Sequence, residues 1–300
     1  QDQVIGRLAI ALLVCAPLLG AQEVLPLAPV LPPRPALPDL PASVRSAGMA
    51  GLAVPLTGDA AVVFDNPAAI GPIRRLSIEA SYARLPNDRW YTTGAAALRI
   101  GRVSVGGGYR YLDYTGDGQI RDNLQWVAAV AGRISPVYAG VSAKYVSLED
   151  SSGTVFRTLT EDASLTLAFF DIASVALVFD NIGTTRLTGE PLDLPSATRL
   201  GFSLNFIDTY SNGRLLGTIE TVWADGESRR TLLGLEGGFV ISGIGLVARI
   251  GHGGQPRLSG AGKTAYGGSG VLSRARVDYA YQPQTAIGSA VHLVGVHWTP

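Results

Sequence analysis

The sequence predicts an all-β fold, an antiparallel transmembrane β-barrel of about 14 strands. Charged residues make up only 16% of the 300-residue chain, against about 25% in average proteins. From residue 74 onward, apolar and polar residues alternate with a period of two, which is typical of strands with one buried face. No stretch in this part of the chain holds the run of ~18 apolar residues that indicates a transmembrane helix. Strands are therefore the elements expected to cross the bilayer.

The N-terminus is typical of an export signal. Arg7 precedes an apolar run that ends near Leu19, and the run is about 12 residues long, which is too short to span a bilayer. Leu19-Gly20-Ala21 supplies the small residues that signal peptidase prefers. We therefore expect a cleaved signal peptide over residues 1–21 and export to the bacterial outer membrane. A lipoprotein is the alternative that Cys15 raises, but Val14 stands where a small residue is expected.

Residues 22–43 form a proline-rich spacer in this interpretation. Glu23 to Pro41 reads EVLPLAPVLPPRPALPDLP. Prolines at this density remove backbone donors and fix φ, so neither a helix nor a regular strand is expected. An extended linker is the main interpretation, and a ligand motif for a partner domain is the alternative.

The strand region, residues 74–300, divides into fourteen alternating segments. Transmembrane strands need roughly 9–11 residues, and these segments have suitable lengths. Several connections carry turn residues, including Thr115-Gly116-Asp117-Gly118 and Ser211-Asn212-Gly213. The expected strands are 74–84, 90–101, 103–114, 122–132, 136–147, 157–169, 172–181, 197–207, 214–224, 230–240, 243–251, 260–271, 274–282 and 288–298.

The polar face of these strands is expected to line a lumen. It is largely Ser, Gly, Ala and Thr with isolated charges of both signs, whereas the wet face of a soluble barrel should carry many Lys and Glu. An exported soluble β-protein is the alternative. Glu236 and Arg249 lie on neighbouring predicted strands, so we expect them to form an ion pair. The candidate lumen residues are Glu79, Arg110, Lys144, Arg199, Glu236, Arg249 and Asp278.

Aromatic residues gather near the predicted strand ends, where interfacial girdles lie in membrane barrels. The last predicted strand ends with Val294, Val296 and Trp298 in alternation. A terminal aromatic strand resembles the signal read by the outer-membrane assembly machinery, although Thr299-Pro300 follows where a final Phe is usual. The girdle candidates are Trp90, Tyr91, Tyr109, Tyr111, Tyr114, Tyr279, Tyr281 and Trp298.

Motifs for catalysis, metals and nucleic acid are not convincing in this sequence. The formal net charge is zero, which does not favour a nucleic-acid partner. Gly262-Lys263-Thr264 lacks the glycine that a phosphate-binding loop requires five residues earlier. Asp113 begins a calcium-loop-like pattern, but Leu124 occupies the position of the final Glu. His292 and His297 have opposite parity on one strand. We expect no enzyme activity, no cofactor and no metal site.

The segment Ser46 to Ile70, SAGMAGLAVPLTGDAAVVFDNPAAI, resembles the N-terminal segment of the FadL superfamily of outer-membrane barrels. The match is a glycine-rich run followed by acidic and small residues and then Asn66-Pro67-Ala68. The resemblance implies that residues 44–73 form a hatch inside a fourteen-stranded barrel, with hydrophobic ligands bound nearby. The hatch motif is Asp65, Asn66, Pro67 and Ala68. From the residues alone, Asn-Pro makes a rigid turn, and its role is either this turn or a direct part in gating.

Later segments resemble one branch of that superfamily, the PorV/PorQ-like proteins. The matching segments include LVFDNIG at 177–183 and DLPSATRLGFSLNF at 193–206, and the likeness spans roughly residues 44 to 298. LGLEGGF, ARIGHG and RVDYAYQP resemble three later strands, with Glu236, Arg249, Asp278 and Tyr279 at matching positions. PorV-like proteins are associated with type IX secretion, whereas FadL moves long-chain fatty acids and is longer than this chain.

Three functions follow as expectations. The first is a secretion-associated barrel that handles exported protein cargo in a type IX-like context. The second is a FadL-like channel that takes up hydrophobic small molecules such as fatty acids or hydrocarbons. The third is a structural barrel with a permanently plugged lumen. The expected partners are outer-membrane lipid, the assembly machinery, and either a secreted protein or a hydrophobic small molecule.

Overall fold

The structure is a computed structural model, and it describes Leu37 and residues 40–85, 89–116, 120–149, 155–169, 172–189, 194–207, 212–253, 264–283 and 290–300. Contacts divide the chain into two units, Gln1–Val30 and Leu31–Pro300. The first unit, the expected signal peptide 1–21 and most of the expected spacer 22–43 lie outside the described residues. Gly262 and Lys263 also lie outside them.

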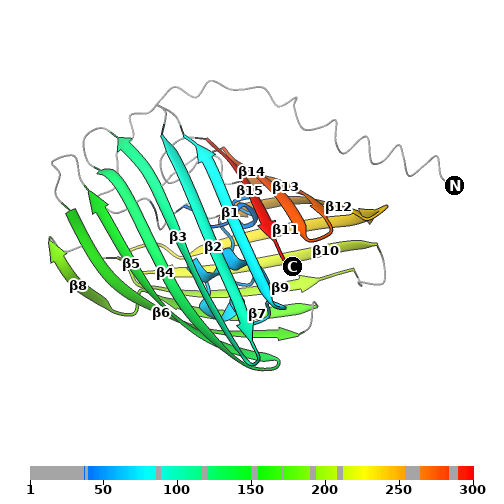
Figure 1. Cartoon of the computed structure of the whole chain (residues 1–300), viewed down its shortest axis with the longest axis horizontal. Coiled ribbons are helices and arrows are strands. Elements are labelled where there is room, and N and C mark those ends of the chain that lie inside the picture. The colour runs from blue at the N-terminus through cyan, green and yellow to red at the C-terminus, as the bar shows by residue number, and fades with distance from the viewer. Residues whose placement is uncertain are drawn as a thin grey trace. The chain divides into compact units, whose positions relative to one another are not determined.

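The second unit is a closed antiparallel barrel (Figure 1). Each strand pairs with its neighbours along the sheet, β1 pairs with β15, and β5 pairs with β6 to close the ring. The ring contains β1 to β7 and β9 to β15, which makes fourteen strands. The bounds are β1 Leu76–Arg84, β2 Trp90–Ile100, β3 Val103–Gly116, β4 Ile120–Ile134, β5 Val137–Glu149, β6 Val155–Phe169, β7 Ala173–Asp180, β8 Thr184–Gly189, β9 Ala197–Asn205, β10 Gly213–Ala224, β11 Arg230–Ile241, β12 Ile244–Gly253, β13 Thr264–Leu272, β14 Ala275–Gln282 and β15 Val291–Trp298.

The fourteen predicted strands are confirmed, and each ring strand overlaps its predicted range. The sequence did not predict β8, which continues β7 after a break and pairs with β6. Asn181 has a φ of 54° at the break. Between the pairs Ala163–Phe179 and Thr160–Thr184, two residues of β6 run beside four residues of the β7–β8 segment. The break is therefore a bulge, which bends a strand without ending its pairing.

The two faces of the barrel have opposite chemistry, as the alternation predicts. Ile78 and Trp126 are 42% and 53% exposed on the outer face. Ser77, Thr93 and Asn123 are buried on the inner face. Apolar residues facing outward and polar residues facing inward are the pattern of a barrel that spans a bilayer.

The two ends of the barrel differ in their connections. At one end, where β1 begins and β15 ends, β2–β3, β4–β5, β11–β12 and β13–β14 are each joined by two residues, β6–β7 by three and β9–β10 by seven. We call this the short-turn end. The connections at the other end, which we call the long-loop end, run from three residues between β3 and β4 to ten between β12 and β13.

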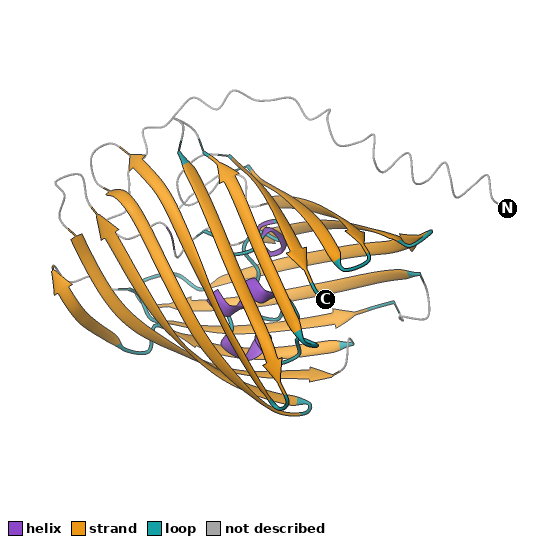
Figure 2. Cartoon of the chain, viewed as in Figure 1, coloured by secondary structure: helices purple, strands orange, loops and turns teal. Residues whose placement is uncertain are grey.

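The hatch lies inside the ring of strands, where Figure 2 shows its short helices between the barrel walls. It comprises α2 (Val44–Ala47) and the 3₁₀ helices η2 (Ala60–Phe64) and η3 (Pro67–Ile70). Ser43 caps α2 by accepting from the Ser46 N–H, and Asn66 caps η3 by accepting from the Ala68 N–H. Apolar hatch residues pack against small residues of the wall, in a cluster that includes Val62, Val63, Phe64, Ile70, Ala95, Ala97, Val127 and Ala129.

The prediction that Tyr91 belongs to the aromatic girdle is wrong. Tyr91 faces the lumen, is 1% exposed, and donates a hydrogen bond of 2.9 Å to the Pro41 carbonyl. Trp90, at the start of β2, does contact Tyr111, with ring centroids 4.7 Å apart, whereas Tyr109 contacts Trp126 in the middle of β3 and β4, with centroids 5.4 Å apart. Parity along β2 places Tyr91 inside because Thr93 and Ala95 are also buried there.

Wall glycines let the hatch backbone approach the strands closely. A Cβ at Gly140 would lie 2.4 Å from the Ala68 nitrogen, and one at Gly251 would lie 2.1 Å from the Met49 carbonyl carbon. Any side chain at these positions would collide with backbone atoms, which cannot rotate away. Gly140 and Gly251 lie on β5 and β12. The hatch is therefore fitted to well-separated parts of the wall.

We predict that Gly140→Ala destabilises the folded barrel by about 1–3 kcal/mol, because the added methyl group overpacks the hatch contact. Denaturant unfolding followed by heat-modifiable gel migration measures the effect. Gly270→Ala is the matched control, since a Cβ there would meet nothing within 4 Å. Equal unfolding midpoints for the two variants would contradict the close fit.

Candidate functional site: a hatch fastened between two cavities

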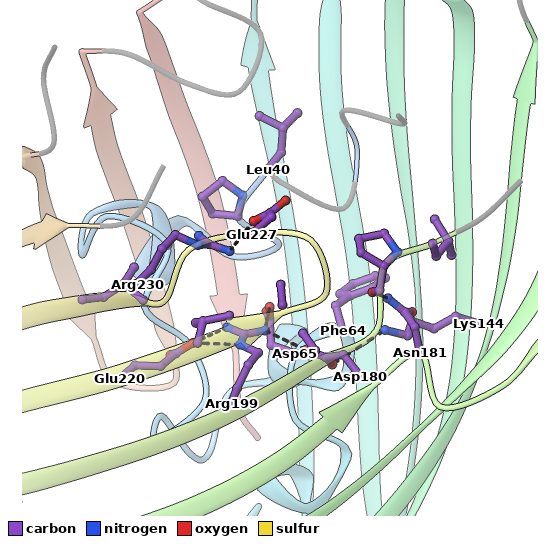
Figure 3. Close-up of a pocket in the computed structure, with 18 of the residues that line it drawn as sticks. Leu40, Phe64, Asp65, Lys144, Asp180, Asn181, Arg199, Glu220, Glu227 and Arg230 are labelled. Atoms are coloured by element: carbon purple, nitrogen blue, oxygen red, sulfur yellow. Dashed lines mark hydrogen bonds and ion pairs between the residues drawn. The ribbon is translucent and has the colours of Figure 1, made fainter. Parts of the chain in front are cut away.

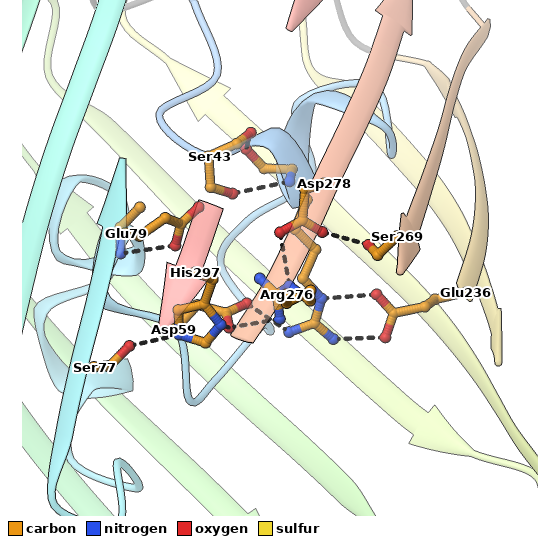
Figure 4. Close-up of polar contacts among 12 residues, drawn as sticks. Ser43, Asp59, Ser77, Glu79, Glu236, Ser269, Arg276, Asp278 and His297 are labelled. Carbon is orange, nitrogen blue, oxygen red and sulfur yellow. Dashed lines mark hydrogen bonds and ion pairs between the residues drawn. The ribbon is translucent and has the colours of Figure 1, made fainter. Parts of the chain in front are cut away.

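The hatch is joined to the barrel by a closed ring of six alternating charges (Figure 4). Arg45 donates to both carboxylate oxygens of Glu236, at 2.8 and 2.9 Å, and to Asp59 at 3.0 Å. The remaining links use charged residues of β11, β12 and β14. In order, the six residues are Arg45, Asp59, Arg276, Asp278, Arg249 and Glu236, and the last four belong to the wall.

Each link of this charge ring has hydrogen-bond geometry. Arg276 bonds Asp59 at 3.1 Å and Asp278 at 2.7 Å. Arg249 bonds Asp278 at 3.1 Å and Glu236 at 2.7 Å. Every carboxylate thus meets two guanidinium groups, which offsets the cost of removing the charges from water. Asp59 also lies 3.7 Å from the His297 ring.

The two hatch members of the charge ring stay ionised over a wide pH range. Burial raises the pKa of the Asp59 carboxyl, but Arg276 and Arg45 outweigh burial and hold that pKa well below its usual range. Burial lowers the pKa of Arg45, but Glu236 and Asp59 outweigh it and raise that pKa. A depressed carboxyl pKa contributes stability that is present above the unfolded pKa and is lost as pH falls through the folded one. The Asp59 contribution is therefore constant above about pH 5.

A second ion cluster lies closer to the long-loop end (Figure 3). Arg199 of β9 contacts Glu220 at 2.6 Å, Asp65 of the hatch at 3.2 Å and Asp180 at 3.6 Å. Lys144 of β5 contacts Asp162 at 2.7 Å and Asp180 at 3.9 Å, which extends the cluster along the wall to β5. Through Asp65, the hatch motif is therefore joined to this second cluster.

Glu220 also holds the hatch backbone. One of its carboxylate oxygens accepts from the Ala53 and Val54 N–H groups, both at 2.9 Å, while the other accepts from Arg199. The Pro55 carbonyl accepts from the Ser174 hydroxyl at 2.6 Å. The segment Leu52–Leu56, which we call the crossing segment, is thereby tied to β7 and β10.

Asn66 joins two parts of the hatch to the wall. Its side-chain amide donates to the Val54 carbonyl at 2.8 Å and to Thr166 of β6 at 3.0 Å. Its carbonyl oxygen accepts from Ala68 N–H at 3.1 Å. The residue is fully buried. Asn66 thus makes the turn expected from the sequence and also pins the crossing segment.

The lumen holds cavities on both sides of the crossing segment. A cavity of about 150 Å³ opens toward the long-loop end and is lined by residues including Leu40, Gly51, Phe64, Arg199, Glu220 and Ala224. A cavity of about 690 Å³ lies at the short-turn end, where Arg45, Thr57, Asp59, Glu236 and Arg276 are among its walls. A smaller space of about 80 Å³ beside Pro55 and Leu56 shares Arg45 and Thr57 with the larger cavity. Hatch residues line both cavities, so the hatch separates the two sides of the lumen.

The structure places all seven predicted lumen residues on the inner face. Glu236 and Arg249 form the expected ion pair and, with Asp278, belong to the charge ring. Lys144 and Arg199 belong to the second cluster. Arg110 bonds Gln125 and the Leu40 carbonyl and lies 4.8 Å from the Phe64 ring centroid. Glu79 accepts from the Ala61 N–H at 3.4 Å, outside both clusters.

Sequence reasoning missed Arg45, Asp59 and Asp180. Arg45 and Asp59 are the charged residues that flank a long apolar and glycine-rich stretch. A charge in such a stretch must find a partner once the stretch is buried, and this signal could have marked both residues. Asp180 ends β7 next to the break, where strand parity becomes uncertain.

The described residues hold neither a helix able to cross a membrane nor a cluster of metal ligands. No helix there is both long enough and apolar enough to cross a membrane. No group of three or more His, Cys, Asp or Glu side chains there is arranged to hold a metal ion.

The fold is that of FadL-type transporters in known structures. The monoaromatic hydrocarbon channel CymD superposes with a TM-score of 0.63 at 12% identity, covering 88% of this chain and 99% of that one. The toluene transporter TbuX of Ralstonia pickettii gives 0.56 at 11%, covering 87% and 98%. A FadL homologue of Pseudomonas aeruginosa gives 0.55 at 12%, covering 88% and 99%. At these identities the likeness establishes the fold alone.

Sequence comparisons add nothing to this. No protein-family model matches the chain. No curated protein matches it either.

We predict that Asn66→Ala loosens the hatch, because the buried Val54 carbonyl loses its donor at a cost of about 1–3 kcal/mol. Trypsin cleavage after Arg45, followed by mass spectrometry, should become at least about fivefold faster as the hatch undocks more often. Asn212→Ala, an exposed asparagine, is the control. Unchanged cleavage in Asn66→Ala would show that the amide does not hold the hatch.

We predict that Glu220→Gln makes the closed barrel conduct ions more often. The substitution keeps the side-chain size but removes the charge that binds Arg199 and the two hatch N–H groups. Single-channel recording in planar bilayers measures the opening frequency. Glu227→Gln, which changes another carboxylate of the long-loop cavity, should leave the frequency near that of the unmodified chain. Identical traces for both variants would exclude Glu220 as the fastening residue.

Proposed function

We propose that this chain is an outer-membrane channel of the FadL superfamily that takes up small hydrophobic molecules. The observation that carries the proposal is the hatch that crosses the lumen between two cavities, with a crossing segment held by a few hydrogen bonds. A permanently sealed barrel would need no cavity on either side of its plug. A general porin would need no hatch. The arrangement fits a channel that opens for a bound molecule.

The connections orient the barrel. Bacterial outer-membrane barrels have short periplasmic turns and longer extracellular loops. The short-turn end then faces the periplasm, and the cavity of about 150 Å³ faces the outside. The ligand would enter this outer cavity first, pass the crossing segment, and leave through the cavity of about 690 Å³.

The outer cavity suits a small ligand. An apolar cavity of about 150 Å³ in another protein holds benzene. Here Phe64, Val222 and Leu232 contribute apolar side chains to a cavity of similar volume, and the second ion cluster forms its polar part. A single aromatic ring fits this space, whereas a long acyl chain would need more room. The substrate class proposed is therefore small hydrophobic molecules of about one ring.

The neighbouring structures support uptake rather than secretion. CymD is described as a monoaromatic hydrocarbon channel and TbuX as a toluene transporter. The PorV/PorQ-like branch and the handling of exported cargo stay predictions, since no observation on the barrel favours them over uptake. Export by a signal peptide likewise stays a prediction.

We predict that Ala224→Trp slows uptake several-fold by filling the outer cavity, into which Ala224 of β10 faces. The measurement is the initial rate of labelled toluene accumulation by cells that lack their own hydrocarbon channel and express the barrel. Ala143→Trp is the matched control because Ala143 is exposed on the outer face of β5. If the unmodified barrel gives no more uptake than cells without it, the proposed function fails and a plugged structural barrel is favoured.

A further inference from the structure

One carboxylate of the outer cavity makes no hydrogen bond with the described part of the protein. Asp180, at the end of β7, is 9% exposed and lines this cavity (Figure 3). Its nearest cations are Arg199 at 3.6 Å and Lys144 at 3.9 Å, and both distances are too long for a hydrogen bond. No other described residue donates to it. Buried polar groups are normally hydrogen-bonded, so this carboxylate calls for a donor from outside the protein.

Ion pairing does not account for the position of Asp180. Lys144 makes its short contact with Asp162, at 2.7 Å, and Arg199 makes its own with Glu220, at 2.6 Å. Each cation would therefore keep a carboxylate at hydrogen-bond distance if Asp180 were replaced by an uncharged residue. A further buried carboxylate at the edge of the cavity costs free energy, and a ligand that donates to it would offset that cost.

The bulge after β7 turns a second acceptor toward the same cavity. Successive side chains of a regular strand point to opposite faces, yet Asp180 and Asn181 both line the outer cavity. The left-handed φ of Asn181, 54°, breaks the alternation, and bulges re-aim side chains beside functional sites. The Asn181 side-chain NH₂ donates to the Pro195 carbonyl at 2.8 Å. Its amide oxygen is then an acceptor next to Asp180 in the chain.

The other walls of the cavity favour a neutral ring over a charged one. Phe64 and Leu232 supply apolar surface, and Leu194 adds more from the chain after β8. The described lining carries four basic and four acidic side chains, so its charges balance. An ionised ligand would bring an unpaired charge into the cavity, which is costly. A neutral ring with one polar substituent suits both the apolar walls and the acceptors at the end of β7.

We propose that the outer cavity selects single rings that carry one neutral hydrogen-bond donor, as in phenols and anilines, and that Asp180 accepts this donor. The inference rests on the proposed uptake function and narrows its substrate class. A phenol hydroxyl resembles that of tyrosine, whose pKa of about 10 keeps it uncharged at neutral pH. Its hydrogen bond to a carboxylate is charge-assisted, which makes it about twice as strong as a neutral one. Toluene contacts the apolar walls alone and therefore binds more weakly.

The test compares two probes of nearly equal size, para-fluorophenol and para-fluorotoluene, by fluorine NMR titration of the full barrel in nanodiscs. We expect the unmodified barrel to bind para-fluorophenol at least about tenfold more tightly, because a hydrogen bond to a charged group contributes about that factor. Asp180→Leu should abolish this preference. Asp180→Asn keeps a neutral acceptor and should lower the preference by about fivefold. In both variants the affinity for para-fluorotoluene should not fall.

Asp225→Asn is the matched control. Asp225 is an exposed aspartate at the same end of the barrel and lies outside the described lining of the cavity, so its substitution should leave the preference unchanged. Heat-modifiable migration checks that each variant is folded. If Asp180→Leu is not folded, the comparison of Asp180→Asn with Asp225→Asn decides the question.

The outcomes separate this inference from the proposed function. Equal affinities of the unmodified barrel for the two probes would overturn the inference and leave uptake of hydrophobic molecules in place. Equal losses for both probes in Asp180→Asn would overturn it by showing that Asp180 only supports the fold. Tighter binding of the cationic para-fluorobenzylamine would overturn it by assigning the carboxylate to ammonium groups. If neither probe binds the unmodified barrel, the proposed function fails and this inference fails with it.

Discussion

The structure depends on one electrostatic constraint, which is the closed ring of six charges between hatch and wall. An isolated charge buried in the lumen would cost several kcal/mol. In this ring each charge has two opposite neighbours at hydrogen-bond distance, so no member is left uncompensated. Removing either hatch member would leave an odd charge among the remaining five. The hatch and the wall therefore specify each other.

The charge ring fixes one part of the hatch and leaves a different part for movement. Glycines in β5 and β12 let the hatch backbone contact the wall directly, and the second ion cluster holds Asp65. The crossing segment lies between these fixed points and is held mainly by Glu220, Asn66 and Ser174. Local opening draws on the least strongly held parts of a structure. The channel proposed here could then open without releasing its plug.

The features that could be predicted from the sequence are those that follow from strand periodicity, namely the strands themselves and the face on which each side chain lies. Alternation identified the fourteen ring strands and placed residues such as Glu236 and Arg249 on the inner face. It could not identify partners, because the link between Arg45 and Glu236 depends on how a segment without periodicity folds inside the barrel. The girdle prediction was wrong at Tyr91 because it rested on the position of the residue near a strand end. Strand parity, which it did not take into account, turns the Tyr91 side chain into the lumen. The β8 extension was missed because the bulge at Asn181 interrupts the alternation.

The separation in sequence between the partners of the charge ring governs the order of assembly. Arg45 and Glu236 are 191 positions apart, and the other wall members lie later still. Contacts of such high sequence separation form late, so the N-terminal segment must wait in a nearly complete cylinder until the last strands arrive. Once β15 pairs with β1, the segment is enclosed on all sides by the wall. We expect that a barrel made without its first 73 residues would regain them from a separate peptide only by entry through an end of the cylinder, and that assembly is most direct when the N-terminal segment is present as the cylinder closes.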